Sequence, residues 1–204
     1  IAGKYDNEFV KENGEWKILK LHPDLNGEWI DGSRIYREGK SMYSLYLTKW
    51  AGVAKSDFTS NYQAWATDDD GNKLVDANGD PYLEDKTLNV QGGQALYWAK
   101  DDAGNEYQTT NWSTAYNSNR YATKSLLPKV YGGFGATITF FGFDASFQMA
   151  YSLGGKIYDS GYQSFMHNGY SSYAGQNWHK DILKSWSPSN PNSNIPRVNA
   201  QERY

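Results

Sequence analysis

The clearest pattern in the chain is a double alternation of apolar and polar residues over Val130–Leu153. From Phe143 to Leu153 the odd-numbered positions are all apolar, whereas the even-numbered positions carry Asp, Ser, Gln, Ala and Ser. From Phe134 to Phe140 the even-numbered positions are apolar and the odd-numbered ones are Gly or Thr. A period of two places alternate side chains on opposite faces of a sheet. The segment therefore predicts two strands, each with one apolar and one polar face.

A two-residue turn at Phe141-Gly142 joins these strands in the most consistent way. It pairs apolar residues with apolar or glycine positions, as in Ile138 with Ala145, and polar residues with each other, as in Thr139 with Asp144. Such turns need a positive φ at both central residues, which glycine adopts easily and phenylalanine does not. The face matching outweighs this conflict, so we expect this register.

Two kinds of protein contain a sheet of this type. In a soluble β-sandwich the apolar face packs on a core. In an outer-membrane barrel the apolar face meets lipid and the polar face lines the lumen. Each predicted strand has the roughly 9–11 residues that cross a bilayer at a tilt. The hairpin alone leaves both interpretations open.

The remainder of the chain has the turn-rich character of an all-β protein. We expect strands at Glu15–Leu21 and over Ser41–Trp50, separated by a polar, turn-rich stretch over residues 27–39. Residues 54–127 are polar and hairpin-like. They contain a short repeat, because Trp65–Asn72 resembles Trp98–Asn105, and we interpret the two copies as hairpins with the same tip.

The last quarter, from Gly154, is rich in Gly, Ser, Tyr and Asn. We expect one or two helical turns over Asn177–Ser185, with Asn177 as the N-cap. The prolines after Ser187 exclude a long helix. Loops of this length are uncommon in compact soluble domains but usual on the outer side of membrane barrels. This segment therefore favours the barrel.

The amino-acid composition limits the kinds of molecule to which the chain can bind. The 204 residues carry a formal net charge of −3, with scattered charges, which argues against a nucleic-acid partner. There is no cysteine, and no apolar run long enough for a transmembrane helix. The first residues do not have the pattern of a signal peptide, so we expect either a mature protein or an internal piece of a longer one.

Candidate chemistry is sparse. From Asp76 the spacing of acidic residues begins like a calcium-binding loop, but Pro81 and Thr87 occupy the positions of the required Gly and Glu. We interpret these aspartates as solvated turn residues, and His22, His167 and His179 as surface or loop residues. No catalytic motif, cofactor motif or metal site is present, so we expect no enzyme, no cofactor and no metal. Loop aromatics are the better candidates, because flat rings stack on sugars and anchor interfaces.

Three ordered segments resemble the C-terminal part of the barrel of SusC/RagA-like TonB-dependent outer-membrane transporters. The resemblance covers roughly residues 34–53 and 95–200. The segments are Arg37–Tyr43 with Lys49–Val53; Leu127–Phe134 with Gly142–Asp144 and Gly154–Asp159; and Trp178–Leu183 with Trp186–Pro188, Asn190-Pro191 and Ile195–Arg197.

The resemblance implies antiparallel transmembrane strands with long extracellular loops, forming part of a large plugged barrel in the outer membrane of a Gram-negative bacterium. Residues 54–94 would be an external hairpin insertion and residues 154–197 a long external loop. The plug domain is missing, so we expect residues 1–204 to be a fragment of the transporter.

The same resemblance implies the partners. These are the rest of the barrel and plug, a SusD-like lipoprotein lid, TonB as the energy source, outer-membrane lipid, and an oligosaccharide or peptide substrate. The aromatics that would contact the substrate or the lid are Trp178, Trp186, Tyr170 and Trp112. The alternative function is a soluble, secreted glycan-binding β module; a secreted glycosidase has no marked residues.

Overall fold

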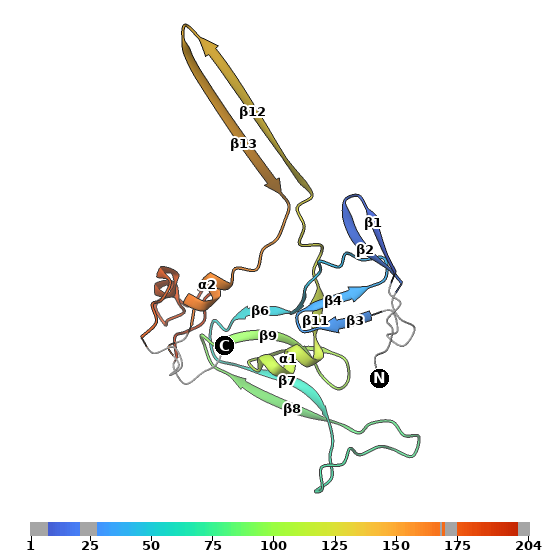
Figure 1. Ribbon diagram of the computed structural model, residues 1–204. Helices are drawn as coiled ribbons and strands as arrows, with labels where there is room; N and C mark the ends of the chain where they lie inside the picture. The colour runs from blue at the N-terminus through green and yellow to red at the C-terminus, as the bar shows by residue number, and fades with distance from the viewer. Residues whose placement is uncertain (1–7, 21–27, 168, 170–174, 200–204) are drawn as a thin grey trace. The chain divides into compact units, whose positions relative to one another are not determined.

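A computed structural model describes residues 8–20, 28–167, 169 and 175–199. Strands make up 47% of it and helices 10%, which confirms the expected β class. The described strands form separate sheets of two or three strands and do not close a barrel. The chain divides into two compact units (Figure 1). The first unit comprises Ile1–Tyr46 and Ala122–Tyr158, and the second comprises Leu47–Tyr121 and Asp159–Tyr204.

The first unit is built from hairpins. Their strands are β1 (Glu8–Glu12) with β2 (Glu15–Lys20), β3 (Glu28–Asp31) with β4 (Arg34–Arg37), and β12 (Val130–Phe140) with β13 (Phe143–Leu153). Strand β2 confirms the strand expected at Glu15–Leu21, of which Leu21 lies outside the described residues. The stretch over residues 27–39 is more regular than expected, because it contains the β3–β4 hairpin around Gly32.

The single strand expected over Ser41–Trp50 is wrong. Only β5 (Tyr46–Thr48) and β6 (Trp50–Val53) are strands there, and β5 contains a boundary between the units. The hydroxyl of Ser41 accepts a hydrogen bond from the backbone N–H of Tyr43, which bends the chain locally. Beyond this bend the Ser44 carbonyl accepts from Ile35 N–H. The backbone thus bonds to separate segments and cannot remain one extended strand.

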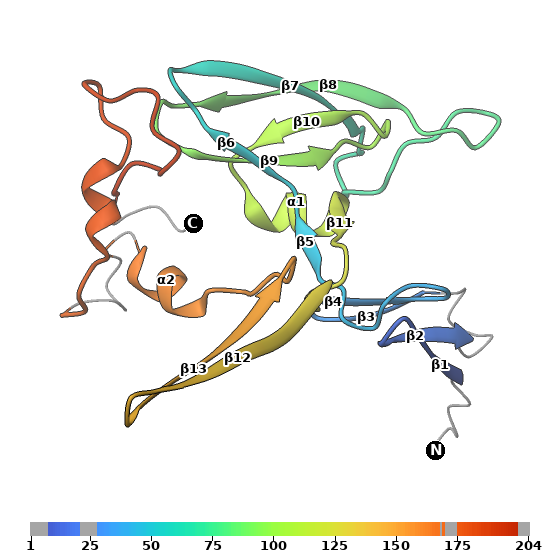
Figure 2. The same ribbon diagram turned by 90° about the horizontal axis from the view of Figure 1, so that it is seen from above.

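The second unit contains a three-stranded sheet in which β9 (Ala95–Lys100) lies between β10 (Glu106–Thr109) and β6 (Figure 2). Beside it runs the long hairpin of β7 (Phe58–Trp65) and β8 (Leu83–Val90), which confirms the hairpin character of residues 54–127. The other elements of this unit are the helices α1 (Trp112–Ser118) and α2 (Ser160–Phe165) and the 3-10 helix η3 (Lys180–Lys184). Strand β11 (Arg120–Ala122) contains the second boundary between the two units.

The core of the second unit lies where β6, β8 and β9 meet. Ala54, Val90 and Leu96 are buried together, against partly buried neighbours that include Phe58. Helix α1 begins at Asn111, whose side chain accepts hydrogen bonds from two N–H groups of the first turn, as an N-cap should. This core positions the sheet from which one wall of the candidate site is formed.

The β12–β13 hairpin has the predicted register in full, including the pairs Ile138 with Ala145 and Thr139 with Asp144. Its turn is Phe141-Gly142, with φ of 45° and 81°. Phe141 thus adopts the left-handed conformation that the turn requires, at a cost of roughly 1–2 kcal/mol for a residue with a side chain. The regular pairing of eleven residues in each strand stabilises the hairpin enough to hold this residue.

The apolar face of this hairpin is exposed along its whole length. Ile138 is 61% exposed, Phe143 78% and Leu153 60%. Eleven residues per strand correspond to about 36 Å of extended chain. Gly132 alone is partly covered: the Tyr151 ring lies over it, and an added Cβ would be 2.6 Å from the Tyr151 hydroxyl. The hairpin therefore presents an apolar surface of continuous aromatic and aliphatic side chains.

Candidate functional site

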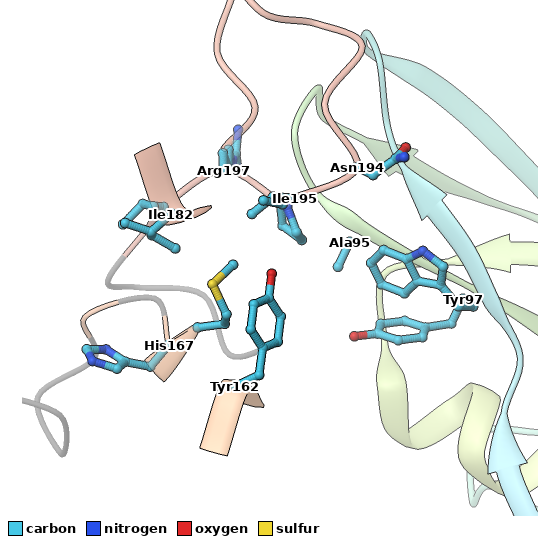
Figure 3. Close-up of a pocket in the computed structure, with 12 residues that line it drawn as sticks. Ala95, Tyr97, Tyr162, His167, Ile182, Asn194, Ile195 and Arg197 are labelled. Carbon is cyan, nitrogen blue, oxygen red and sulfur yellow. The ribbon is translucent and has the colours of Figure 1, made fainter. Parts of the chain in front are cut away.

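The second unit contains a pocket of about 280 Å³ (Figure 3). Residues from the sheet form one wall, residues of α2 and η3 form another, and the segment over residues 194–198 closes it. The lining is predominantly aromatic and aliphatic, and includes Trp50, Tyr97, Tyr162, Met166, Ile182 and Ile195. Pockets for small ligands are mostly apolar in this way, and this volume is near the lower end of their range.

Helix α2 places two of the lining side chains. The Asp159 carboxylate accepts a hydrogen bond from Tyr162 N–H at 2.8 Å and so caps the helix. Tyr162 and Met166 are four residues apart, which places their side chains on the same side of the helix. The Phe165 carbonyl accepts from His179 N–H at 3.0 Å, and this bond links α2 to the start of η3. Ile182 of η3 then completes this wall.

The segment from Trp186 to Arg197 is fixed on the β8–β9 turn. The Trp186 ring packs directly over Gly92 and Gly93. Arg197 N–H donates to the Gly93 carbonyl at 2.8 Å, and the guanidinium donates to the Gly92 carbonyl and to Oε1 of Gln91. This docking holds the residues before Arg197 at the mouth of the pocket.

The wall formed by the sheet is aromatic. Trp50 of β6 and Tyr97 of β9 meet edge to face, with ring centroids 5.3 Å apart. Ala95 is buried and leaves room in front of the two rings. Burial raises the pKa of the Tyr97 hydroxyl above its ordinary value, which already leaves the group protonated at neutral pH. Figure 3 shows the Tyr97 and Tyr162 hydroxyls directed into the space between the two walls.

Arg197, His167 and Asn194 are the strongly polar residues of the lining, and the first two bond to the protein itself. Arg197 is held by Gly92 and Gln91, as described above. Nδ1 of His167 accepts hydrogen bonds from Nε1 of Trp178 at 2.9 Å and from Gly169 N–H at 3.2 Å. His167 is a loop residue, as expected, but it is buried, at only 7% exposed. The Trp178 indole N–H is a hydrogen-bond donor to Nδ1 of His167, which favours the burial of the imidazole.

The aromatics predicted as contacts do not line the pocket. Trp178 is half exposed and packs beside His167, and Trp186 covers the β8–β9 turn. Trp112 lies on α1 against Tyr116, with ring centroids 4.7 Å apart. Tyr170 lies outside the described residues. The prediction that these four residues contact a substrate or lid remains a prediction.

Tyr162 is among the loop aromatics that the sequence offered as candidates, but the other residues that line the pocket were missed, for two reasons. Trp50 and Tyr97 come together only through the pairing of β6 with β9, which no local pattern marks. Tyr162 and Met166 have a helical spacing, but α2 is too short to stand out in a glycine-rich segment. The helical turn expected over Asn177–Ser185 is confirmed as η3, although His179 and not Asn177 is its N-cap.

The aspartate clusters form a recurring turn. In the repeat, Asp68 N–H donates to the Asn72 carbonyl at 2.9 Å, and Asp101 N–H donates to the Asn105 carbonyl at 2.9 Å, which confirms that the two tips are alike. The candidate calcium loop contains a third copy, in which the Asp76 carboxylate accepts from the N–H groups of Asn78 and Asp80. No group of three or more metal-ligating side chains occurs in the described part of the chain.

Asp101 also ties its turn to strand β7. Its two carboxylate oxygens accept from different N–H groups, that of Asn105 at 2.7 Å and that of Gln63 at 3.0 Å. Burial raises the pKa of Asp101, but these hydrogen bonds outweigh it and the net pKa lies below 3.8. The charged form is therefore favoured by folding.

We expect Asp101→Asn to destabilise the second unit by about 1 kcal/mol at pH 7, because an amide has one acceptor oxygen in place of two. A group whose pKa is depressed on folding contributes stability above its unfolded pKa, and this contribution is lost as the pH falls through the folded value. The stability of the wild type should therefore decline below about pH 3.8, and that of the variant should decline less. Urea unfolding between pH 2.5 and 7 measures both effects. The exposed Asp69, changed to Asn, is the control and should leave the pH profile unaltered.

Comparisons with protein-family models, with curated proteins and with solved structures found no match. None of the helices among the described residues is long and apolar enough to span a membrane.

Proposed function

We propose that the chain is part of an active transporter in the outer membrane of a Gram-negative bacterium, of the SusC/RagA-like, TonB-dependent type. The observation that carries this proposal is the β12–β13 hairpin, with its exposed apolar face and eleven-residue strands. Soluble monomers rarely expose apolar patches of more than a few hundred Å². A barrel strand needs such a face, because in that setting the apolar side chains contact lipid.

The two ends of the β12–β13 hairpin support an orientation of the chain in the outer membrane. Outer-membrane barrels have short periplasmic turns and long external loops. Phe141-Gly142 would be periplasmic, and Gly154–Arg197 would lie outside the cell. Residues 54–94, which contain the β7–β8 hairpin, would also be external. In this arrangement Thr137, Asp144 and their neighbours on the polar face would line the lumen.

The resemblance supplies the remaining parts of the proposal. A SusD-like lipoprotein would close over the external side, and the plug would couple the transporter to TonB. The chain itself would have no enzymatic activity. Trp178 and Trp112, both about half exposed, would be available for the lid or for an oligosaccharide or peptide substrate. Tyr170 and Trp186 are the other two residues proposed as contacts.

Lipid contact can be tested with a tryptophan placed on each face. We expect the emission of the new tryptophan in Phe147→Trp to be quenched by brominated lipids after the chain is transferred from detergent into vesicles. Gln148→Trp, on the opposite face, should be quenched much less. The eight native tryptophans are common to both variants and to the wild type, so the difference reports the hairpin. Equal quenching in the two variants would contradict the proposal.

The alternative function, a soluble glycan-binding module, predicts the opposite behaviour toward lipid. A detergent-free, monodisperse monomer that bound oligosaccharides and ignored vesicles would replace the transporter proposal. The exposed rings of Trp178 and Trp112 support this alternative, because flat aromatic rings also stack on sugars.

A further inference from the structure

We propose that the pocket of the second unit binds an uncharged single-ring aromatic ligand that carries a hydroxyl group, of the phenol type. The proposal does not depend on the membrane assignment, because all of the lining residues belong to the second unit. It rests on the size of the pocket, on the chemistry of its walls and on the direction of two hydroxyl groups.

The volume suits one substituted ring. The pocket measures about 280 Å³, whereas an engineered apolar cavity of about 150 Å³ is already large enough to bind benzene. A phenol with a small substituent would therefore fit, and a larger ligand would leave most of its surface outside. Met166 can adapt to the edge of a ring, since the unbranched methionine side chain fills irregular space.

The walls select against charged ligands and sugars. A sugar site needs several polar side chains that can be turned toward the ligand hydroxyls. In this pocket the Arg197 guanidinium is directed at the β8–β9 turn, and Nδ1 of His167 is taken by Trp178 and Gly169. Apart from Asn194 and the two tyrosine hydroxyls, the groups that remain in the lining are aromatic and aliphatic. Such walls favour a flat, uncharged ring, which stacks or meets them edge to face.

The two tyrosine hydroxyls add a polar contact to this apolar setting. Tyr97 comes from the sheet and Tyr162 from α2, and both point into the space between the walls (Figure 3). A hydroxyl both donates and accepts hydrogen bonds, so it can pair with a phenol in either direction. A tyrosine hydroxyl is protonated at neutral pH, and burial raises the pKa of Tyr97 further, so its hydroxyl can donate.

The experiment uses the whole chain, with 4-fluorophenol as the probe and 19F line width as the signal. We expect saturable binding that p-cresol displaces. Tyr162→Phe keeps the ring but removes its hydroxyl, and should weaken 4-fluorophenol binding about 3- to 10-fold while leaving fluorobenzene binding unchanged. Ala95→Leu fills the pocket and should weaken both probes more than tenfold. Tyr121→Phe, outside the pocket, is the control and should change neither.

Three outcomes would overturn the proposal. The first is the absence of saturable 4-fluorophenol binding. The second is binding that Ala95→Leu and Tyr162→Phe leave unaltered, which would place the probe elsewhere. The third is displacement of the probe by maltose, or tighter binding of maltose, which would identify a sugar site. Because Tyr162→Phe is conservative, it keeps the test decisive even if Ala95→Leu fails to fold. The tryptophan quenching test of the hairpin is independent of all three outcomes.

Discussion

Phe147→Lys should lower the partition of the chain into lipid vesicles by about 30-fold to several hundred-fold. Phe147 is near the middle of β13, on the apolar face, and pairs with Ala136 of β12. A lysine on the lipid side at the bilayer centre costs roughly 2–4 kcal/mol, and each 1.4 kcal/mol corresponds to a factor of ten. Vesicle flotation of the purified chain, over a series of lipid concentrations, measures the partition coefficient.

Gln148→Lys provides the matched control. It introduces the same charge one residue further along the same strand, but on the polar face, where Gly135 is its partner. A lumen-facing lysine remains hydrated, so this variant should partition within a few-fold of the wild type. A common loss in both variants would mean that net charge, and not the face of the hairpin, controls the interaction with lipid, and the orientation of the hairpin would have to be abandoned.

The hairpin could be predicted because its information is local. Alternation over Val130–Leu153 fixes both faces, and matching those faces fixes the register. The turn at Phe141 shows that strand pairing can outweigh a local backbone preference. A φ of 45° is unfavourable for phenylalanine, yet the pairing of the strands on either side holds the residue there. Local preference at one residue is worth about a kilocalorie per mole, whereas the register involves every pair along both strands.

The same pattern over Ser41–Trp50 did not produce one strand. Alternation says which side chains share a face, but a strand also needs one neighbour along its whole length to accept its hydrogen bonds. The carbonyl of Ser44 finds its partner in Ile35, and Leu45 bonds to Thr123, in a different part of the sequence. A short stretch of sequence does not show which distant residues will accept or donate its hydrogen bonds. The interruption of the strand could therefore not be predicted.

The pocket illustrates the same limit. Its aromatic walls come from β6, β9 and α2, three elements separated along the sequence, and only their packing brings Trp50, Tyr97 and Tyr162 to one place. The sequence did identify aromatic residues in loops as the promising class. It could not distinguish those that face the cavity from Trp186, whose ring serves to hold the segment before Arg197 on the β8–β9 turn. That distinction depends on what lies beneath each ring.

Gly93→Ala should destabilise the second unit by about 2–5 kcal/mol, because two costs coincide at this residue. Gly93 has a φ of 85°, which an alanine adopts at a cost of roughly 1–2 kcal/mol. A Cβ at this position would also lie 2.5 Å from the Trp186 ring, so the ring would have to move, and overpacking of this kind costs about 1–3 kcal/mol. Urea unfolding followed by tryptophan fluorescence measures the loss.

Alanine variants of two other glycines measure the backbone cost and the steric cost separately. Gly104 has a φ of 87° with open space where its Cβ would lie, so Gly104→Ala should show the backbone cost alone. Gly92 lacks a positive φ, but its Cβ would lie 2.7 Å from the Trp186 ring, so Gly92→Ala should show the steric cost alone. In a Trp186→Leu background the cost of Gly93→Ala should fall toward that of Gly104→Ala but stay above it, because the contact with the ring is removed while the added Cβ still lies 2.9 Å from Cβ of Arg197. If Gly93→Ala and Gly104→Ala were equally destabilising in the wild-type background, the Trp186 ring would not be seated on this turn, and the wall that it helps to hold at the pocket would need another support.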